Sequence, residues 1–164
     1  MANTDAPFGL RPAKSPAGNV YANPYKALNS VTIKEGDLVE LSSDGFIDIA
    51  TTANGPFLGV AAASDPSSVT TSTERTLLIY DDPHQEFECQ ADSGVVAQTN
   101  VGERFLAQLD TASALLSAHV VDVVALDSGL QPLLVTAISP AVGNAVGSFS
   151  KLIVKIMNHI KSDV

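Results

Sequence analysis

The densest group of side chains that could do chemistry lies at residues 81–88, which read DDPHQEFE. Successive side chains of a strand point to opposite faces, so His84, Glu86 and Glu88 would share one face. Nitrogen and oxygen ligands of this kind could hold Zn²⁺ or another transition metal, or could serve an enzyme or a carbohydrate-binding module. No second histidine and no cysteine falls on that face. We therefore interpret the group as the solvent-facing side of a strand that follows a proline-containing turn.

Three histidines are candidates for the base of a nucleophilic site, and they are His84, His119 and His159. Such a site needs a serine or cysteine beside a histidine that a carboxylate orients. None of the three is accompanied by the Gly-x-Ser-x-Gly turn that presents the nucleophile in many hydrolases. We predict that the chain is not an enzyme and has no catalytic residues.

Two further motifs indicate structure and not chemistry. Gly143 and Gly147 have the glycine spacing of a phosphate-binding loop, but the lysine that such a loop requires is missing. Cys89 alternates with Phe87, so we expect it to point inward as a small core residue and not to act as a reactive thiol. The residues thus predict neither a cofactor nor a metal site.

The composition is that of one ordinary globular domain. A chain of 164 residues has room for a single core. Hydrophobic residues make up 45% and charged residues 16% of the chain, whereas about 25% charged is usual. The chain therefore has apolar surface to bury and is not expected to be disordered. Its single cysteine excludes a disulfide within the chain and an all-cysteine zinc site, so packing must hold the fold.

The net charge of −9 argues against nucleic-acid binding, because such binding needs a basic stripe that displaces counterions from phosphates. No segment approaches the roughly 20 apolar residues of a membrane span. The N-terminus also lacks the basic start and apolar stretch of a signal peptide. We expect a chain that is made and kept in solution, with neither nucleic acid nor membrane as a partner.

Charge is unevenly distributed along the chain. Residues 1–34 contain four basic residues and one acidic residue, and residues 151–164 contain three basic residues and one acidic residue. Residues 35–150 contain only two arginines against sixteen acidic residues. The asymmetry indicates that the basic ends meet something acidic, either the body of this chain or a partner, and the alternative is that both ends are simply solvated.

Residues 1–30 contain four prolines and two glycines and show neither helical nor strand periodicity. Proline fixes φ and removes a backbone donor, so we predict an extended or turned arm without regular structure. Phe8, Leu10, Tyr21 and Tyr25 are apolar anchors along this arm, and they would bury area only in a groove of another surface.

Residues 31–164 are predicted to form the β domain. Short runs of β-type residues alternate with turn signals, and Asp44-Gly45 predicts a two-residue type I′ hairpin turn. We predict one short helix at Thr111 to Ala118 and a loop at Gly143 to Ser150. The expected strands are Asp37 to Ser42, Phe46 to Ala50, Phe57 to Ala63, Arg75 to Tyr80, Gln85 to Gln90, Arg104 to Leu109, His119 to Leu126, Leu133 to Ile138 and Leu152 to Ile160. The fold class is all-β, a compact barrel or jelly-roll-like sandwich of about eight short strands with an extended N-terminal arm.

Several phrases occur in order along about half of the chain: Met1 to Pro12, Pro24-Tyr25, Gly36 to Gly45, Phe57 to Ala61, Tyr80 to Asp92 and Leu152 to His159. Together they resemble the capsid decoration, or cement, proteins of tailed bacteriophages. The segment between Asn100 and Ser150 contains no phrase of this family.

The resemblance implies a structural virion protein on the outer surface of a phage head, assembled in the host cytoplasm and without catalytic residues. Its partners would be the major capsid protein and copies of itself, as a trimer or dimer. The arm would lie along the shell and be poorly ordered in the free protein. Its capsid-binding residues would be Phe8, Leu10, Arg11, Lys14, Tyr21 and Tyr25. A tail or neck component with a similar β domain is the alternative.

Overall fold

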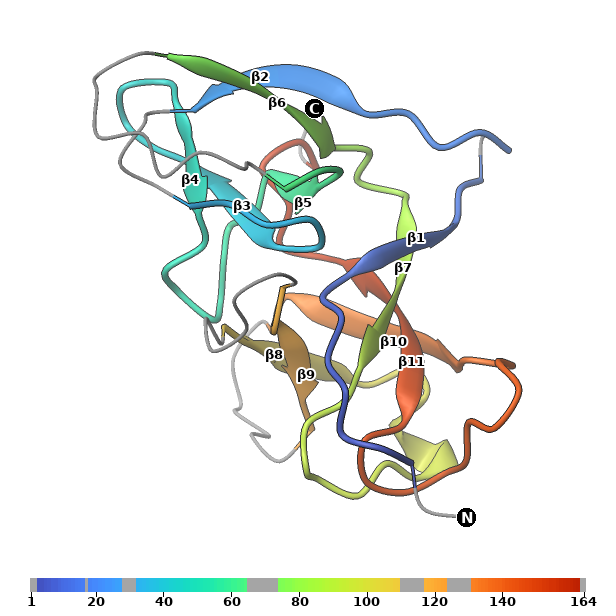
Figure 1. Ribbon diagram of the computed structural model, residues 1–164. Helices are drawn as coiled ribbons and strands as arrows, with labels where there is room; N and C mark the ends of the chain where they lie inside the picture. The colour runs from blue at the N-terminus through green and yellow to red at the C-terminus, as the bar shows by residue number, and fades with distance from the viewer. Residues whose placement is uncertain are drawn as a thin grey trace.

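The computed structural model describes residues 3–16, 18–27, 32–64, 74–109, 117–123 and 131–162 (Figure 1). Within these residues the chain forms strands and a single turn of 3₁₀ helix, which confirms the all-β fold class. No helix in the described part of the chain is long and apolar enough to cross a membrane. The elements are β1 (Arg11–Lys14), β2 (Asn23–Ala27), β3 (Leu38–Leu41), β4 (Ile47–Ile49), β5 (Gly59–Ala61), β6 (Arg75–Tyr80), β7 (Glu86–Gln90), η1 (Gln98–Asn100), β8 (Arg104–Gln108), β9 (Val120–Asp122), β10 (Leu133–Ile138) and β11 (Lys151–Ile156).

The nine strands predicted from the sequence correspond, in order, to β3 through β11. The loop predicted at 143–150 is also confirmed, since no strand or helix forms there. Most of the helix predicted at Thr111 to Ala118, namely residues 111–116, lies outside the described residues. The two additional strands, β1 and β2, come from the N-terminal arm, for which no regular structure was expected.

Five strands close into a small barrel in the order β2-β4-β3-β5-β6. All paired neighbours are antiparallel except β2 and β4, which meet in parallel at Ala27 and Ile47. Its interior is filled by small and branched side chains, as the taper of a five-stranded barrel requires. The buried side chains are Ala27, Ile33, Val39, Ile47, Leu58, Ala61, Leu77 and Ile79.

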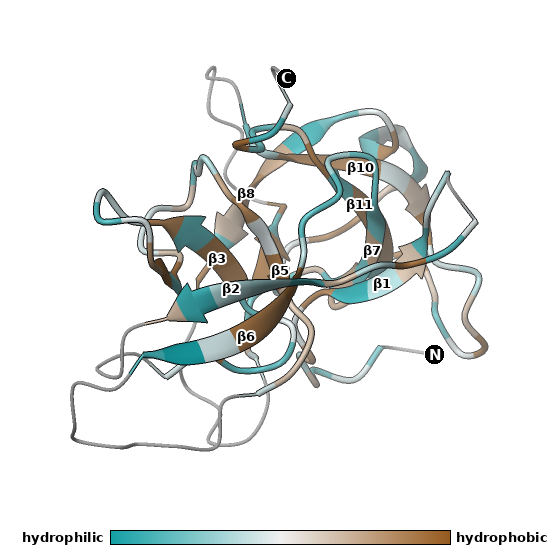
Figure 2. Ribbon diagram, turned by 90° about the horizontal axis from the view of Figure 1, so that it is seen from above, coloured by the Kyte–Doolittle hydropathy of each residue, from teal (hydrophilic) through white to brown (hydrophobic). Residues whose placement is uncertain are grey.

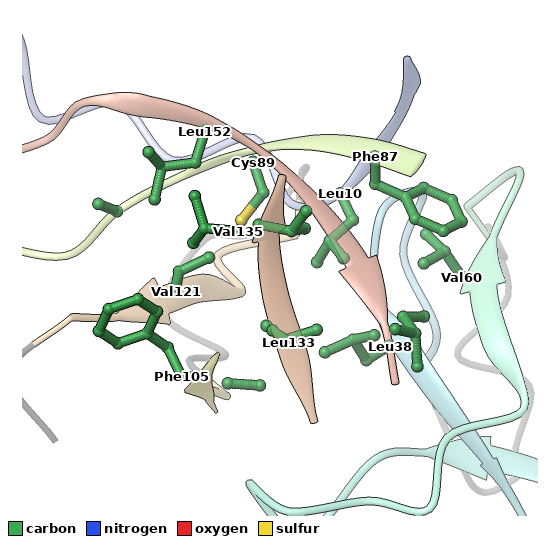
Figure 3. Close-up of a cluster of buried hydrophobic side chains, with 14 of the residues drawn as sticks. Leu10, Leu38, Val60, Phe87, Cys89, Phe105, Val121, Leu133, Val135 and Leu152 are labelled. Carbon is green, nitrogen blue, oxygen red and sulfur yellow. The ribbon is translucent and has the colours of Figure 1, made fainter. Parts of the chain in front are cut away.

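The other strands form a sheet in the order β1-β7-β11-β10-β8-β9. Ala91, directly after β7, forms a parallel bridge with Val121 of β9, so the sheet curls back on itself. The concave side of this sheet holds the larger core. Figure 3 shows this core, and its labelled side chains include Phe87, Phe105 and Leu133.

The wall between the two cores is shared. In β3, Leu38 faces the larger core and Val39 the barrel core; in β5, Val60 and Ala61 divide in the same way. Figure 3 shows Leu38 and Val60 beside Leu10 and Phe87. Because successive strand residues point to opposite faces, these two strands are buried on both sides and join the sheets into one body.

The N-terminal arm is a component of both sheets. β1 pairs with β7, placing Arg11 opposite Glu88, and β2 pairs with β6 along its whole length. Prolines are compatible with these strands because β1 is an edge strand and most of β2 is paired on one side only. The expectation of an arm without regular structure is therefore wrong, whereas the poor order of the arm in the free protein stays a prediction. In Figure 2, β1 and one end of β2 are hydrophilic (teal).

The predicted hairpin forms, but its turn differs from the predicted one. Leu41 pairs with Ile47, and Ser42 N–H donates to the carbonyl of Phe46 at 2.9 Å, so three residues make the connection. Gly45 has φ of 85°, whereas Asp44 is not in the left-handed region. A three-residue connection with a single left-handed glycine replaces the type I′ turn, which needs positive φ at two positions.

Gly9 allows the arm to dock, and substituting it should destabilise the protein. Its φ is +71°, and an added Cβ would overlap the Cβ of Ser117 and lie 2.7 Å from the carbonyl oxygen of Gly36. Gly18 is a matched control, because its φ is +79° but no atom lies within 4 Å of an added Cβ. We expect Gly18→Ala to lower the free energy of unfolding by about 1 kcal/mol through backbone strain. Gly9→Ala should lower it by about 3 kcal/mol, because overpacking adds to that strain. Urea denaturation of both variants measures the difference, and equal losses would show that the arm does not pack here as described.

Candidate interaction surface

The side chains that could have formed a metal or enzyme site lie on the outer face of β7. His84 is exposed, and its Nδ1 lies 3.2 Å from Lys155 Nζ. Glu86 is opposite Lys14 of β1 on one side and Lys155 of β11 on the other. Directly opposite residues of antiparallel strands share a face, so the acidic strand lies between two basic ones.

This arrangement gives the outer face of β7 a structural role. Glu88 accepts a hydrogen bond from the Ser139 hydroxyl and faces Arg11 across the sheet. Among the described residues, no three His, Cys, Asp or Glu side chains are grouped closely enough to hold a metal. Part of the positive charge at the two ends of the chain therefore meets the acidic body of the same chain.

A serine, a histidine and an aspartate do come together in the interior, in an arrangement unsuited to a catalytic triad. His119 Nδ1 accepts a hydrogen bond from the Leu38 N–H at 3.0 Å, and its Nε2 lies 3.7 Å from Asp37 Oδ1. The Ser117 hydroxyl accepts the His119 backbone N–H at 3.2 Å. Both ring nitrogens thus face groups other than the hydroxyl, and the ring is fully buried. Through its hydrogen bond with Leu38, His119 connects β3 to the residues directly before β9.

Cys89 is buried in the larger core, as its alternation with Phe87 predicts. Burial raises the pKa of its thiol to about 12. Since the thiolate is the reactive form, this cysteine is a packing residue.

Asp81 follows β6, is 4% exposed and has three side-chain partners. It accepts hydrogen bonds from Asn23 Nδ2 at 2.7 Å, from the Tyr25 hydroxyl and from Lys161 Nζ. Asn23 and Tyr25 belong to β2, whereas Lys161 lies near the C-terminus. We call these four residues the Asp81 junction, and it joins both ends of the chain to the turn between the two sheets.

Burial by itself raises the pKa of Asp81, but the hydrogen bonds from Lys161, Tyr25 and Asn23 outweigh it and hold that pKa below its ordinary value. Burial and the carboxylate of Asp81 raise the pKa of Tyr25. Desolvation lowers the pKa of Lys161, but its hydrogen bond to Asp81 leaves it above the usual value. In the junction, Asp81 and Lys161 thus form a charged pair. The neutral phenol of Tyr25 and the amide of Asn23 donate the other hydrogen bonds to the carboxylate.

His159 lies beside this junction and is 4% exposed. Its Nδ1 accepts the backbone N–H of Lys161 at 3.0 Å, and burial lowers the pKa of its ring to about 4. Strand alternation predicts that His159 shares the outward face of Lys155 and Met157, but β11 ends at Ile156. The chain then turns toward the barrel, where His159 forms a parallel bridge with Phe57.

The six arm residues expected to bind a capsid have different surroundings. Leu10 is 2% exposed in the larger core, so in this conformation it contacts its own body and no partner. Tyr25 is partly buried in the Asp81 junction. Phe8 is partly buried, with Arg11 Cζ 4.7 Å and Lys151 Nζ 5.8 Å from its ring centroid. The other members of the set, Arg11, Lys14 and Tyr21, are exposed, Tyr21 to 65%.

Three exposed valines lie on two loops, where strand periodicity gives no signal. Val95, Val142 and Val146 are 75%, 103% and 58% exposed. The loops are in contact, because Val96 N–H donates to the Gly147 carbonyl at 3.1 Å. The signal in the sequence is the absence of charged residues from 93–102 and 139–150.

A hollow of about 310 Å³ lies between the arm and the loop after β10. Its lining includes Phe8, Phe149 and the amides of Asn3, Gln90 and Asn144. All three amides are hydrogen-bonded to backbone groups of the arm or the loop. The hollow therefore lies at the boundary where the arm packs against the loop after β10.

The Asp81 junction should contribute measurably to stability. We expect Asp81→Asn to lower the free energy of unfolding at pH 7 by about 2 kcal/mol, because Lys161 and the arm lose a buried anionic partner. Asp5→Asn makes the same change of net charge at an exposed position and should have little effect. Because the pKa of Asp81 is lower in the folded chain, its contribution is complete above the unfolded pKa and is lost as pH falls through the folded pKa. The difference between wild type and Asp81→Asn in urea denaturation should therefore shrink below about pH 4.

His159 should give the stability a pH dependence in a higher range. Its ring takes up a proton near pH 6.5 in the unfolded chain but only near 4 in the folded chain. Between these values the unfolded state binds more protons, so the free energy of unfolding decreases as the pH is lowered, by up to about 1.4 kcal/mol per pH unit. His159→Gln should flatten that slope between pH 6.5 and 4.5, whereas His84→Gln, at an exposed position, should retain it. An unchanged slope in His159→Gln would contradict this assignment.

Comparison of the chain with protein-family models, with curated proteins and with solved structures finds no match.

Proposed function

We propose that this chain is a structural virion protein that binds the outer surface of a phage head and stabilises the shell by bridging major capsid protein subunits. It acts as a binding protein and not as an enzyme. The proposal rests on the ordered phrases that resemble phage decoration proteins, and on where those phrases lie in the fold.

The observation that carries the proposal is that the phrases, though scattered along the sequence, meet in space. Leu10 N–H donates to the Gly36 carbonyl at 2.9 Å, and Gly36 N–H donates to the Ala61 carbonyl at 2.9 Å. Three separate phrases are thus joined by two consecutive hydrogen bonds. They form the contact between the arm and the shared wall of the two cores.

Two of the remaining phrases, at 80–92 and 152–159, lie next to this contact. Val60 pairs with Tyr80, and Phe57 bridges to His159. The phrase at 80–92 contains β7, which lies between β1 and β11 in the sheet. The residues that carry the resemblance are therefore residues that contact one another in this fold. This favours a shared architecture over a chance similarity of composition.

The exposed side chains of the arm are suited to contact a large partner. Arg11, Lys14 and Tyr21 project from a segment that is paired along β1 and β2, so little ordering entropy would be lost on binding. The rest of the chain carries the net negative charge that keeps a surface protein soluble. Weak contacts of this kind become strong when many copies bind a repeating lattice.

A tail or neck component is the second candidate, because the same β architecture and an exposed arm suit that role as well. Quantitative mass spectrometry of purified virions beside DNA-filled heads without tails separates the two. For a decoration protein we expect a copy number close to that of the major capsid protein, and equal amounts on tailless heads. Absence from heads, or only tens of copies per particle, would overturn the shell assignment and favour the tail or neck.

A further inference from the structure

Residues 158–162 follow β11 and turn back against the barrel, and we call them the C-terminal turn. Phe57 N–H donates to the carbonyl of Asn158 at 2.9 Å, and Ile160 N–H donates to the carbonyl of Phe57 at 2.9 Å. Ile160 also packs against the buried side chains of the barrel. In contrast to this turn, β11 is paired along its length with β7 and β10. The C-terminal turn is therefore a unit that can open while the sheet stays intact.

His159 holds this turn together in one protonation state. Its Nδ1 accepts the backbone N–H of Lys161 at 3.0 Å, and its carbonyl accepts the N–H and the hydroxyl of Ser162, at 3.0 and 2.8 Å. An imidazole nitrogen that accepts a hydrogen bond carries no proton, so this bond assigns the single proton of the neutral ring to Nε2. That nitrogen is buried and has no hydrogen-bond partner among the described residues. The turn is thus built around a neutral imidazole.

A second proton on this ring is incompatible with the turn. It would bind to Nδ1 and point at the N–H of Lys161, and two donors cannot form a hydrogen bond with each other. The charged ring would remain 4% exposed, and within the described part of the chain neither of its nitrogens would have an acceptor. Burial of an ion without hydrogen bonds is strongly unfavourable, so protonation favours a conformation in which the ring reaches water.

The charged groups that face the ring have opposing effects. Asp81 and Asp82, in the turn between β6 and β7, attract a proton to it, whereas Lys161 repels one. The carboxylate of Asp81 is already paired with Lys161 and accepts the hydroxyl of Tyr25, the titratable group of β2 at this junction. The segment 53–58, on which the turn packs, contains no charged residue. The surroundings therefore compensate a charged imidazole poorly.

The equilibrium between the closed and open turn is consequently linked to pH. Burial lowers the pKa of His159 to about 4 and outweighs the attraction of the two carboxylates. An open turn places the ring in water and returns its pKa to the ordinary value. The open state therefore binds more protons between these two values, and its population relative to the closed state should increase by up to about tenfold for each unit by which the pH is lowered.

We propose that the C-terminal turn is an acid-sensitive latch, which opens when His159 is protonated while both sheets remain folded. Opening would remove from the backbone of Phe57 both of its partners in the turn. It would also separate Lys161 from Asp81, so that the Asp81 junction would keep only its contacts with β2. A decrease in pH would thus release the C-terminal residues and expose a carboxylate. The latch is a property of the single chain and does not rest on the proposed binding to phage heads.

Hydrogen exchange of the wild-type chain, measured by mass spectrometry between about pH 7 and pH 4.5, tests the proposal. Protection factors remove the effect of pH on the chemical exchange step itself. We expect the protection of the C-terminal turn to fall by up to about tenfold per pH unit, whereas that of β7 and β11 stays constant. This range lies above the titration of Asp81, because the pKa of that carboxyl is below its ordinary value.

Two variants and a second measurement separate the latch from general acid unfolding. His159→Asn removes the titrating ring and retains an acceptor near the position of Nδ1, so its turn should keep the same protection throughout this range. His84→Asn removes an exposed histidine and should behave as the wild type does. NMR titration of the wild-type chain needs no variant, and the His159 ring should take up its proton at the pH at which the amide signal of Lys161 changes.

Three results would overturn the proposal. The first is a protection of the C-terminal turn that does not change with pH in the wild type. The second is a decrease that persists in His159→Asn. The third is a loss of protection in β11 at the same pH, which would show that acid unfolds the whole chain.

Discussion

A buried carboxylate must be compensated, and the fold satisfies Asp81 with groups from two distant parts of the chain. Asn23 and Tyr25 come from β2, Lys161 from the C-terminal segment, and Asp81 itself from the turn between β6 and β7. An unpaired charge at this position would cost several kcal/mol, so the three segments are held to one arrangement. The same contacts lie where β2 pairs into the barrel, and Lys161 reaches Asp81 because β11 ends at Ile156 and the chain turns toward the barrel.

The sequence predicts the interior of the fold well and its ends poorly. β3 to β11 are predicted because apolar residues alternate and turn residues separate them, for example Phe87 and Cys89 in β7. The arm is missed because Pro12 and Pro24 argue against a strand, and only the pairing pattern shows that their missing donors are not needed. The burial of His159 is missed because alternation holds only while a strand continues, and β11 ends three residues earlier.

The same comparison clarifies what could be known about function. The uneven charge leaves open whether the basic ends meet the body or a partner, and the sheet shows Lys14, Lys155 and Lys161 facing acidic groups of the same chain. The charge asymmetry is therefore partly an internal feature. The exposed apolar groups of the described residues include Tyr21 on the arm and the valines on the loops. Loop valines have no periodic signal, so only their exposure in three dimensions distinguishes them from a core.

The hydrogen bonds between Asn3 and the loop after β10 have a consequence for how the chain folds. Asn3 and Ala145 are 142 positions apart, and their hydrogen bonds close a loop that contains nearly the whole polypeptide. β1 pairs with β7, and β7 pairs with β11, so neighbouring strands of the sheet are distant in the sequence. Few native contacts are therefore local in sequence. Chains dominated by distant pairings fold slowly, since the entropy of closure is lost before the contacts are gained. On the ribosome, the nascent chain would hold β1 and β2 unpaired until β6 and β7 had been synthesised, and Asn3 could reach Ala145 only when nearly the whole chain was complete.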